Sequence, residues 1–307
     1  MGEKDISQRI IEKHNEVFAD IINVLIYNGK EVIKPENLEQ AEQHEVFKKD
    51  EKLHELIRDV AKFYRNKEYR IAFYGIENQM KIDKFMPIRI MAYDALTYIS
   101  QLLQIKEERH KARQEIQKDG ENKKRHRRTI YPVKTIVLYF GTEEWKTPLS
   151  LKDCIKNFDG SDYKITVIQL SKLPQKVINK FKSDFHLIAD FVANHEKENY
   201  EFPQWEIVHK RDVINVLKAL TGDNTIDVLY NECEEGGEKV KDDFFKRYTE
   251  RKIKQGIERG RQSEAIDIAK RMLEAGALSF EDISVYASLP LEKVKELAEE
   301  VCVTAGK

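Results

Sequence analysis

The sequence predicts an α/β fold followed by a helical C-terminal part, and three features of the chain lead to this prediction. Runs of β-branched and aromatic residues, typical of buried strands, occupy residues 69–76, 135–140 and 163–170. Segments with apolar residues at helical spacing lie before, between and after these runs. Beyond residue 231 the periodic segments are all helical and highly charged. We therefore expect a mixed central sheet flanked by helices over residues 1–230, and an all-helical tail over residues 231–307.

The composition fits a protein with heavily charged surface helices. Charged residues make up 35% of the 307 residues and apolar residues 41%, with a formal net charge of −1. The N-terminus shows no apolar signal core, and no apolar run is long enough to span a bilayer, so we expect a cytoplasmic protein without a membrane partner. The near-zero net charge does not exclude DNA as a partner, because phosphate binding depends on where positive charge lies.

The first part of the chain contains one clear helix and one ambiguous segment. Apolar residues at helical spacing predict a helix over Ser7–Tyr27, which Asn28-Gly29 would end. The polar stretch Pro35–Asp50 predicts a solvated connection or a short polar helix. The segment Leu53–Tyr64 fits either the first strand of a hairpin or a helix, since its apolar residues also recur at helical spacing.

The central stretch of the chain predicts a strand, a charged turn and a helix. The strand covers Tyr69–Ile76, and Pro87 has a backbone angle suited to the first turn of the helix. Glu77 and Gln79 stand at the C-terminal end of the strand, where side chains can reach a ligand while remaining rigidly held. Because they are two residues apart on an extended chain, their side chains should point the same way, and that of Asn78 the opposite way.

Several acidic residues could come together around this strand end. In the hairpin arrangement Asp59 would lie beside Glu77, and an acid such as Asp20 could approach from the first helix. The acids would supply the hard oxygen ligands that suit Mg²⁺, with Gln79 as a polar orienting group, and the chemistry of the ion would be phosphodiester hydrolysis. Acids at strand ends are also common in α/β proteins without a metal site, so spacing alone leaves both interpretations open.

A strongly basic segment follows the central helix. Residues Lys106–Arg128 contain ten lysines or arginines, five acidic residues and almost no apolar ones. We expect a mobile insertion here, for which two interpretations remain open. It is either a solvated excursion between two elements or an arm that contacts phosphates and adds salt-sensitive affinity for DNA.

The remainder of the α/β part predicts two further helices. One covers Ser183–Val192, with Ser183 as its N-cap, and the other covers Asp212–Leu220 and is closed by Gly222. The tail then predicts three short helices. They fit either a helix-turn-helix-like unit that reads DNA or a small bundle for packing or homo-oligomerisation, and the last helix has as much acidic as basic charge.

Other types of site are excluded by spacing. The three cysteines form no CxxC pair, which argues against a disulfide framework and a structural zinc site. The eight histidines show no HExxH and no paired metal spacing, and no glycine-rich loop followed by Lys-Ser/Thr occurs. Zinc peptidase and nucleotide hydrolase activities are therefore not expected.

The stretch YRIAFYGIENQMKIDKFMPIRIMAYDALTYISQL resembles the core of the Rpn-type family, which comprises bacterial recombination-promoting nucleases, also described as transposases, of the PD-(D/E)XK nuclease superfamily. Further similar stretches are FADIINVLIYNG, RDVAKFY, VLYFGTEEWKTPLSL, FKSDFHLIADFV, LKALTGD and the glycine-spaced helical tail. The resemblance extends through nearly the whole chain and is most specific in the block from GIENQ to MPIR. It implies a restriction-endonuclease-like fold with a metal-dependent DNA endonuclease site.

By position, the resemblance assigns a role to each site residue. Asp59 in RDV takes the place of the motif aspartate, Glu77 that of the second acid, and Gln79 that of the superfamily lysine. Asp20 is the choice for the acid from the first helix, with Glu16 as the alternative. These residues would form the catalytic site, in which Asp59, Glu77 and Asp20 bind the metal ion and Gln79 positions the attacking water.

Three further residues are expected to support DNA binding. Arg89 and Tyr93 lie one turn apart on the helix after the site and suit phosphate contact or bracing. Because glutamine at position 79 supplies no positive charge, either the metal ion or Lys81 would have to compensate for the missing lysine.

The sequence therefore predicts a Mg²⁺-dependent DNA endonuclease, with Mn²⁺ as an alternative ion, linked to DNA recombination or mobile elements. Its products should carry a 5′-phosphate and a 3′-hydroxyl. The main alternative is a nuclease-fold module with weak or no catalysis that binds DNA or another protein. A third interpretation is an oligomeric scaffold in which the C-terminal helices are the functional part.

Overall fold

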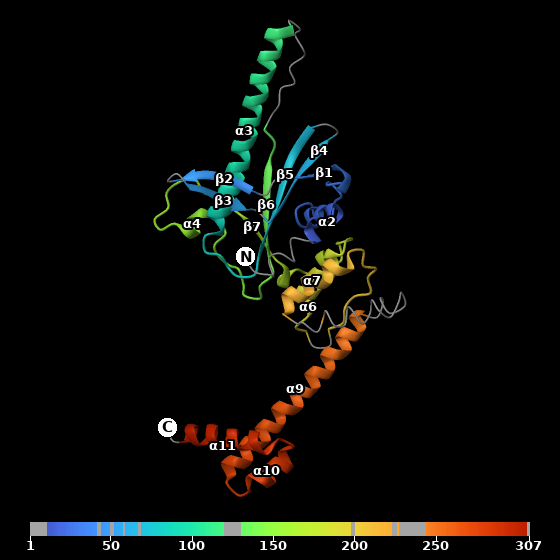
Figure 1. The fold of residues 1–307 in the computed structure, drawn as a ribbon, viewed down its shortest axis with the longest axis vertical. Helices are drawn as coiled ribbons and strands as arrows, with labels where there is room; N and C mark the ends of the chain where they lie inside the picture. The colour runs from blue at the N-terminus through green and yellow to red at the C-terminus, as the bar shows by residue number, and fades with distance from the viewer. Residues whose placement is uncertain are drawn as a thin grey trace. The chain divides into compact units, whose positions relative to one another are not determined.

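The fold is known from a computed structural model, which describes residues 11–41, 44–49, 52–57, 59–66, 69–119, 130–197, 200–222, 226 and 244–305. The chain divides into two compact units, Met1–Asp227 and Val228–Lys307 (Figure 1). The first contains a β-sheet with helices on both faces, and the described residues of the second, 244–305, contain helices and turns.

A five-stranded mixed sheet forms the centre of the first unit. Its strand order is β1-β4-β5-β6-β7, with antiparallel pairing from β1 to β5 and parallel pairing from β5 to β7. This arrangement confirms the predicted α/β fold with a mixed sheet flanked by helices. The strands are β1 (Leu38–Gln40), β4 (Val60–Asn66), β5 (Tyr69–Gln79), β6 (Val133–Tyr139) and β7 (Thr166–Gln169).

The ambiguous segment before the central strand is extended. β4 and β5 form a hairpin, so the alternative prediction of a helix over Leu53–Tyr64 is wrong. The polar stretch Pro35–Asp50 also departs from expectation, because η1 (Pro35–Asn37) leads directly into β1 and a separate two-stranded sheet follows. That second sheet pairs β2 (His44–Lys49) with β3 (Lys52–Ile57). Over such short runs, a helix and a strand can place their apolar residues at many of the same positions. Pairing with distant strands therefore determines that these segments are extended.

Helix α2 (Asn15–Leu25) lies on one face of the sheet (Figure 1). Its apolar side is buried, and the Tyr27 hydroxyl just after the helix lies 2.6 Å from the Tyr74 hydroxyl on β5. The predicted stop after the helix is confirmed, because Asn28 and Gly29 both have a positive φ.

Helix α3 (Met86–Asp119) covers the opposite face of the sheet. Its side chains Met86, Ile90 and Tyr93 pack on side chains of β6, and the Thr135 hydroxyl on β6 donates a 2.6 Å hydrogen bond to Asp94. These contacts anchor the first three turns of α3 on the sheet.

The second half of α3 replaces part of the expected mobile insertion. Residues 106–119 continue the helix, which extends beyond the sheet in Figure 1. Lysine, glutamate, arginine and glutamine have high helix propensity, and Glu107 pairs with Lys111 at helical spacing, 2.8 Å apart. The rest of the predicted insertion, residues 120–128, lies outside the described residues.

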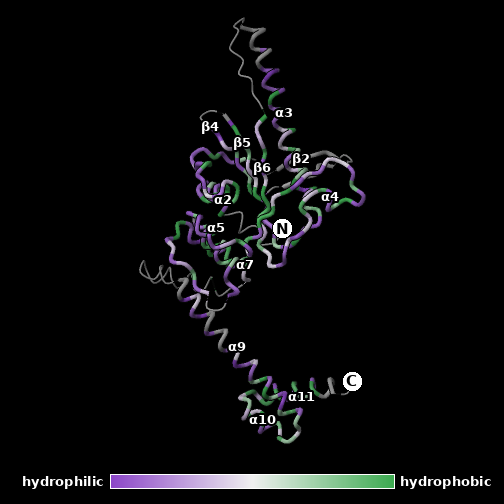
Figure 2. Tube along the Cα trace, turned by 180° about the vertical axis from the view of Figure 1, so that it is seen from behind, coloured by the Kyte–Doolittle hydropathy of each residue, from purple (hydrophilic) through white to green (hydrophobic). Residues whose placement is uncertain are grey.

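Several further helices described in the first unit follow β6. They are α4 (Leu151–Cys154), η2 (Leu170–Lys172), α5 (Gln175–Ile178), α6 (Phe185–Asn194) and α7 (Lys210–Thr221). Nearly all of α6 is buried, and the strands and α6 carry much of the apolar colour in Figure 2. Gly222, with φ of 68°, ends α7 as predicted. The predicted N-cap of α6, Ser183, is wrong by one residue, because Asp184 occupies the N-cap position.

In residues 244–305 of the second unit, three helices share a small apolar core. They are α9 (Phe244–Ala275), α10 (Phe280–Ala287) and α11 (Leu291–Ala305), and their buried residues are Ala269, Ile283, Ala287, Val294 and Leu297. The Ser279 hydroxyl accepts a 3.1 Å hydrogen bond from the Asp282 N–H and thereby caps α10. Across the part of the chain that the structure describes, no helix combines the length and apolarity needed to cross a membrane.

A single buried side chain fixes the loop after α2. The Asn23 carbonyl oxygen accepts hydrogen bonds from the N–H groups of Val32 (3.0 Å) and Ile33 (2.8 Å), and its amide nitrogen donates to the Ile33 carbonyl (2.8 Å). Asn23 is 7% exposed, so these backbone groups depend on it for their partners.

We expect Asn23→Ala to lower the free energy of unfolding by about 2–4 kcal/mol, because three hydrogen bonds are lost and two backbone donors lose their partner. Urea denaturation would measure the change. Asn179→Ala, at an exposed position, is the matched control and should change stability by less than about 0.5 kcal/mol. Equal effects of the two substitutions would contradict this role of Asn23.

Candidate active site

Two buried carboxylates lie next to each other on neighbouring strands. The register of the antiparallel β4–β5 hairpin pairs Val60 with Ile76, so Asp59, just before Val60, and Glu77, just after Ile76, are neighbours on one side of the sheet. Asp59 is 3% exposed and Glu77 is 1% exposed. We call these two residues the carboxylate pair. The structure thus brings together the two acids that the sequence proposed for adjacent strands.

Asp59 is held in place by the backbone of β5. The Asn78 N–H donates a 2.7 Å hydrogen bond to the Asp59 carboxylate. The Phe73 N–H donates to Pro132 just before β6, so the N–H five residues later points to the other side of the strand, toward β4. The Asp59 side chain therefore takes the place of a backbone carbonyl where the ladder between β4 and β5 ends.

Glu77 is braced by groups from its own strand and from α3. Arg89 forms an ion pair with Glu77, and the Gln79 amide donates a 3.3 Å hydrogen bond to the same carboxylate. The Arg89 guanidinium also pairs with Asp83 at 2.8 Å and donates to the Tyr93 hydroxyl at 3.3 Å. One guanidinium thus links two carboxylates and a phenol around the end of β5.

The pKa values of Arg89 and Tyr93 report the acidic surroundings. Burial alone would lower the pKa of Arg89, but the charge of Glu77 and the hydrogen bonds to Asp83 and Tyr93 raise it above its usual value. The pKa of Tyr93 is raised, first by burial and then by the charge of Glu77, with a smaller contribution from Asp59. Both groups therefore keep their protons at neutral pH, so Arg89 stays cationic and Tyr93 stays neutral.

The other side of β5 carries a second polar network. The Asn78 amide donates a 2.8 Å hydrogen bond to Glu12, which is fully buried, so Asn78 points away from Glu77 as expected. On the same side, the fully buried Lys62 ammonium donates to the Lys13 carbonyl at 2.5 Å and to Asn15 at 2.6 Å. Burial lowers the pKa of Lys62 to about 8, although Glu16 and Glu12 partly oppose this shift.

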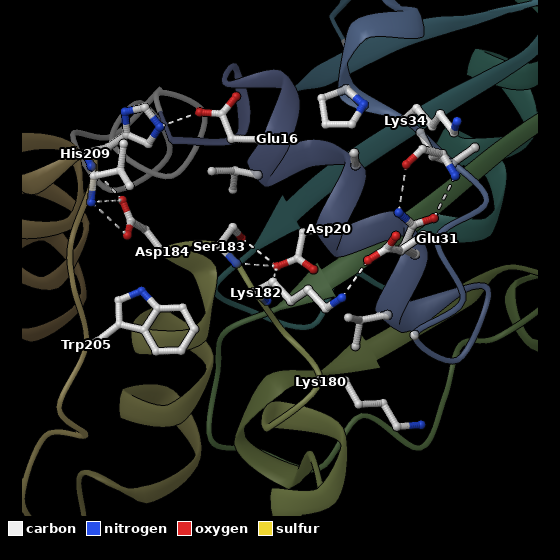
Figure 3. A pocket seen from close by; sticks show the side chains of 18 of the residues that line it. Glu16, Asp20, Glu31, Lys34, Lys180, Lys182, Ser183, Asp184, Trp205 and His209 are labelled. Carbon is white, nitrogen blue, oxygen red and sulfur yellow. Dashed lines mark hydrogen bonds and ion pairs between the residues drawn. The ribbon is translucent and has the colours of Figure 1, made fainter.

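The acids expected from the first helix have other partners. Asp20 accepts hydrogen bonds from the Lys182 N–H (2.8 Å), the Ser183 N–H (2.8 Å) and the Ser183 hydroxyl (2.7 Å), and so holds the turn before α6 (Figure 3). Glu16 lies 2.6 Å from the His209 ring. Within the described residues, these hydrogen-bond partners of Asp20 and Glu16 do not include Asp59 or Glu77.

The acid that reaches the end of β5 from this region is Glu12, which the sequence analysis missed. Glu12, Glu16 and Asp20 are four residues apart and would share one face of an unbroken helix. The chain turns at Lys13-His14 before α2 begins, so Glu12 leaves that face and points toward Asn78 instead. The spacing of four residues was a sequence signal that could have added Glu12 to the candidate acids. The turn at Lys13-His14, which separates Glu12 from the other two, has no comparable signal in the sequence.

Among the residues expected to contact DNA, only Lys81 is exposed. Tyr93 is 2% exposed, and the Arg89 guanidinium is engaged by Glu77 and Asp83. These contacts correspond to the bracing role that the sequence left open for both residues. Asp83 was not proposed, because its six-residue separation from Arg89 crosses a turn and follows no helical or strand period.

The residues at the carboxylate pair fit a hard divalent cation. Mg²⁺ is commonly held by one or two carboxylates, with waters and substrate phosphate completing its octahedral shell. Asp59 and Glu77 supply two carboxylates at the end of β5, and the Gln79 amide lies beside Glu77. The carboxylate pair therefore has the ligand type that such an ion takes.

A cavity of about 780 Å³ lies elsewhere in the first unit, between α2 and the segment 180–209 (Figure 3). Its lining includes Asp20, Lys182 and Trp205, and none of Asp59, Glu77 or Gln79. Acidic side chains outnumber lysines in this lining, so the cavity does not favour a phosphate group. This cavity and the carboxylate pair are therefore separate features of the unit.

Comparisons of the chain with protein-family models, with curated proteins and with solved structures gave no match. The residues of this chain and the geometry of the carboxylate pair are therefore the basis for inferring its function.

The buried Lys62 predicts a specific pH dependence of stability. Its pKa is about 8 in the folded protein and near 10.5 when unfolded, so between these values the unfolded state binds more protons. We expect the stability of the wild type relative to Lys62→Met to rise by about 2 kcal/mol between pH 7.5 and 10.

Urea denaturation across this pH range would measure the difference, with the exposed Lys176→Met as the control whose offset stays constant. An NMR titration of ¹³C-labelled lysine would test the same point without a substitution. A Lys62 signal that titrates near pH 10.5 would refute the prediction.

Proposed function

We propose that this chain is a metal-dependent DNA endonuclease with a restriction-endonuclease-like core. The observation that carries the proposal is the carboxylate pair, two buried acids on adjacent strands next to an amide and a fixed guanidinium. This arrangement agrees with the roles that the resemblance to Rpn-type nucleases assigns to Asp59, Glu77 and Gln79. The proposed substrate is DNA, and the proposed reaction is hydrolysis of a phosphodiester bond.

In this proposal Asp59 and Glu77 hold Mg²⁺ or Mn²⁺. When bound, the ion would lower the pKa of a water molecule and neutralise charge that develops on the phosphate. Asn78 keeps Asp59 in a fixed position through its backbone N–H, and Arg89 keeps Glu77 in a fixed position through the ion pair. Gln79 orients the attacking water with its amide group.

The glutamine at position 79 has a consequence for the rate. A lysine there would bring positive charge to the developing pentavalent phosphate, and glutamine does not. The nearest described cation, Arg89, is directed at Glu77 and Asp83. We therefore propose a slow enzyme that depends on its metal ion for transition-state charge, with the exposed Lys81 as the chain's own contribution near the site.

DNA binding would involve the basic region on and after α3. The helix carries Lys106, Arg109 and Lys111 beyond the sheet, and further basic residues follow in the sequence up to Arg128. Such contacts to phosphate give affinity that does not depend on sequence and falls with added salt. The exposed Val285 and Tyr286 on α10 support our proposal that the tail mediates homo-oligomerisation.

We expect wild-type protein to nick supercoiled plasmid in the presence of Mg²⁺ or Mn²⁺, and Asp59→Asn and Glu77→Gln to reduce the rate at least about 100-fold, because each removes a ligand charge. Gel analysis of plasmid over time would measure the rates. Glu201→Gln, at an exposed acid, is the matched control and should cleave like wild type. Metal-dependent cleavage that persists in folded Glu77→Gln would refute the site.

One observation favours a second function, that of a nuclease-fold binding module. Arg89 and Gln79 both donate to the same Glu77 carboxylate, and these contacts compete with a metal ion for that group. A folded wild type that binds DNA in a salt-sensitive manner but never cleaves it with either metal would support this function. An unchanged affinity after neutral substitution of Lys106, Arg109 and Lys111 would exclude the basic region as the contact.

A further inference from the structure

A second group of metal-ligating side chains lies where the N-terminal ends of α2 and α7 meet. His14 precedes α2 and Glu16 lies in its first turn, while His209 precedes α7 and Asp212 lies in its first turn. We call these four residues the histidine–carboxylate cluster. They come from two segments almost two hundred residues apart in the sequence, and none belongs to the carboxylate pair.

The geometry of the cluster is compact. The rings of His14 and His209 stack with their centroids 3.6 Å apart and their planes 15° apart. His14 Nε2 lies 2.8 Å from Asp212, and His209 Nε2 lies 2.6 Å from Glu16. One ligand atom from each of His14, Glu16 and His209 falls within 4.8 Å of the other two. The cluster therefore presents two imidazoles and a carboxylate to one small volume.

The cluster is also accessible. The side chains of His14, His209 and Asp212 are 33%, 18% and 24% exposed, so an ion can reach them from solvent. The Glu16 side chain is half-exposed, so its carboxylate is open to an ion as well.

We propose that His14, Glu16 and His209 bind a divalent transition metal ion of the Zn²⁺ type, with Asp212 orienting the His14 ring. Two imidazoles and one carboxylate form a ligand set that Zn²⁺ takes, whereas Mg²⁺ takes oxygen ligands almost alone. Ligands of a tetrahedral zinc ion lie about 3.3 Å from one another, so Glu16 and His209 Nε2, now 2.6 Å apart, need to separate only slightly. A carboxylate that fixes a ligating histidine is a common companion of such sites.

The bound ion would connect α2 to α7. Without it, these two helix ends are joined through the two histidine–carboxylate contacts and the stacked rings. With it, one ion would bind side chains from both segments beside the cavity that Glu16 and His209 help to line. This site is independent of the proposed nuclease function, because its ligands come from other elements and suit a different class of metal.

The test is Zn²⁺ binding to the full-length protein after treatment with chelator, measured by calorimetry and by the rise in melting temperature. We expect wild type to bind Zn²⁺ at this site and to gain thermal stability, since the ion binds only the folded arrangement. His14→Gln and His209→Gln should each weaken the binding more than about 100-fold, and Asp212→Asn about 10–100-fold. A large excess of Mg²⁺ should not compete.

Matched controls separate this site from others in the chain. His110→Gln, at an exposed histidine on α3, should leave Zn²⁺ binding unchanged. Circular dichroism of the metal-free variants checks their fold, and if a histidine variant is unfolded, Glu16→Gln at a half-exposed side chain replaces it. Wild type that binds no Zn²⁺, or binding equal in wild type and folded His14→Gln or Glu16→Gln, would overturn the proposal.

Discussion

The hydrogen bond from the Asn78 backbone N–H to Asp59 is the constraint on which the candidate active site depends. A strand N–H inside a protein needs a hydrogen-bond partner. The described β4–β5 ladder ends at the pair Val60–Ile76, and past this end the Asn78 N–H donates to a side chain instead of a backbone carbonyl. The Asp59 carboxylate meets that need and is thereby fixed beside Glu77. Because the donor is part of the β5 backbone, the position of Asp59 is as rigid as the sheet, which is the rigidity that a site for ions and water requires.

Because side chains alternate along β5, residues at the end of this strand contact α3 on one face of the sheet and the N-terminal segment on the other. Glu77 points to the α3 face and meets Arg89, while Asn78 points to the opposite face and meets the buried Glu12. Each contact gives a partner to a charged or polar group that would cost several kcal/mol to bury alone. The two networks therefore make the placement of α3 and of the N-terminal segment sensitive to the same few residues, so that the fold and the candidate site are hard to alter separately.

The sequence predicts the features that follow from local periodicity. It misses the features that depend on contacts between distant segments or on a break in a helix. The strand β5, the start of α3 and the opposed directions of Glu77 and Asn78 follow from extended periodicity and from Pro87. The choice of Asp20 assumes a continuous first helix, and the turn at Lys13-His14 gives the strand end to Glu12 instead. The long continuation of α3 was expected to be an insertion because it lacks apolar residues, although charged residues of high helix propensity sustain a helix without a core.

The histidine–carboxylate cluster shows why a search for short motifs is incomplete. His14 and Glu16 are two residues apart, His209 and Asp212 are three apart, and neither pair alone has the spacing of a metal motif. Only the meeting of α2 and α7 unites them. If both proposals hold, the chain would use oxygen ligands on one face of β5 and imidazole ligands at the ends of two helices. Ligand softness would then keep Mg²⁺ and Zn²⁺ at different places, so that the ion that stabilises the fold need not compete with the ion that serves hydrolysis.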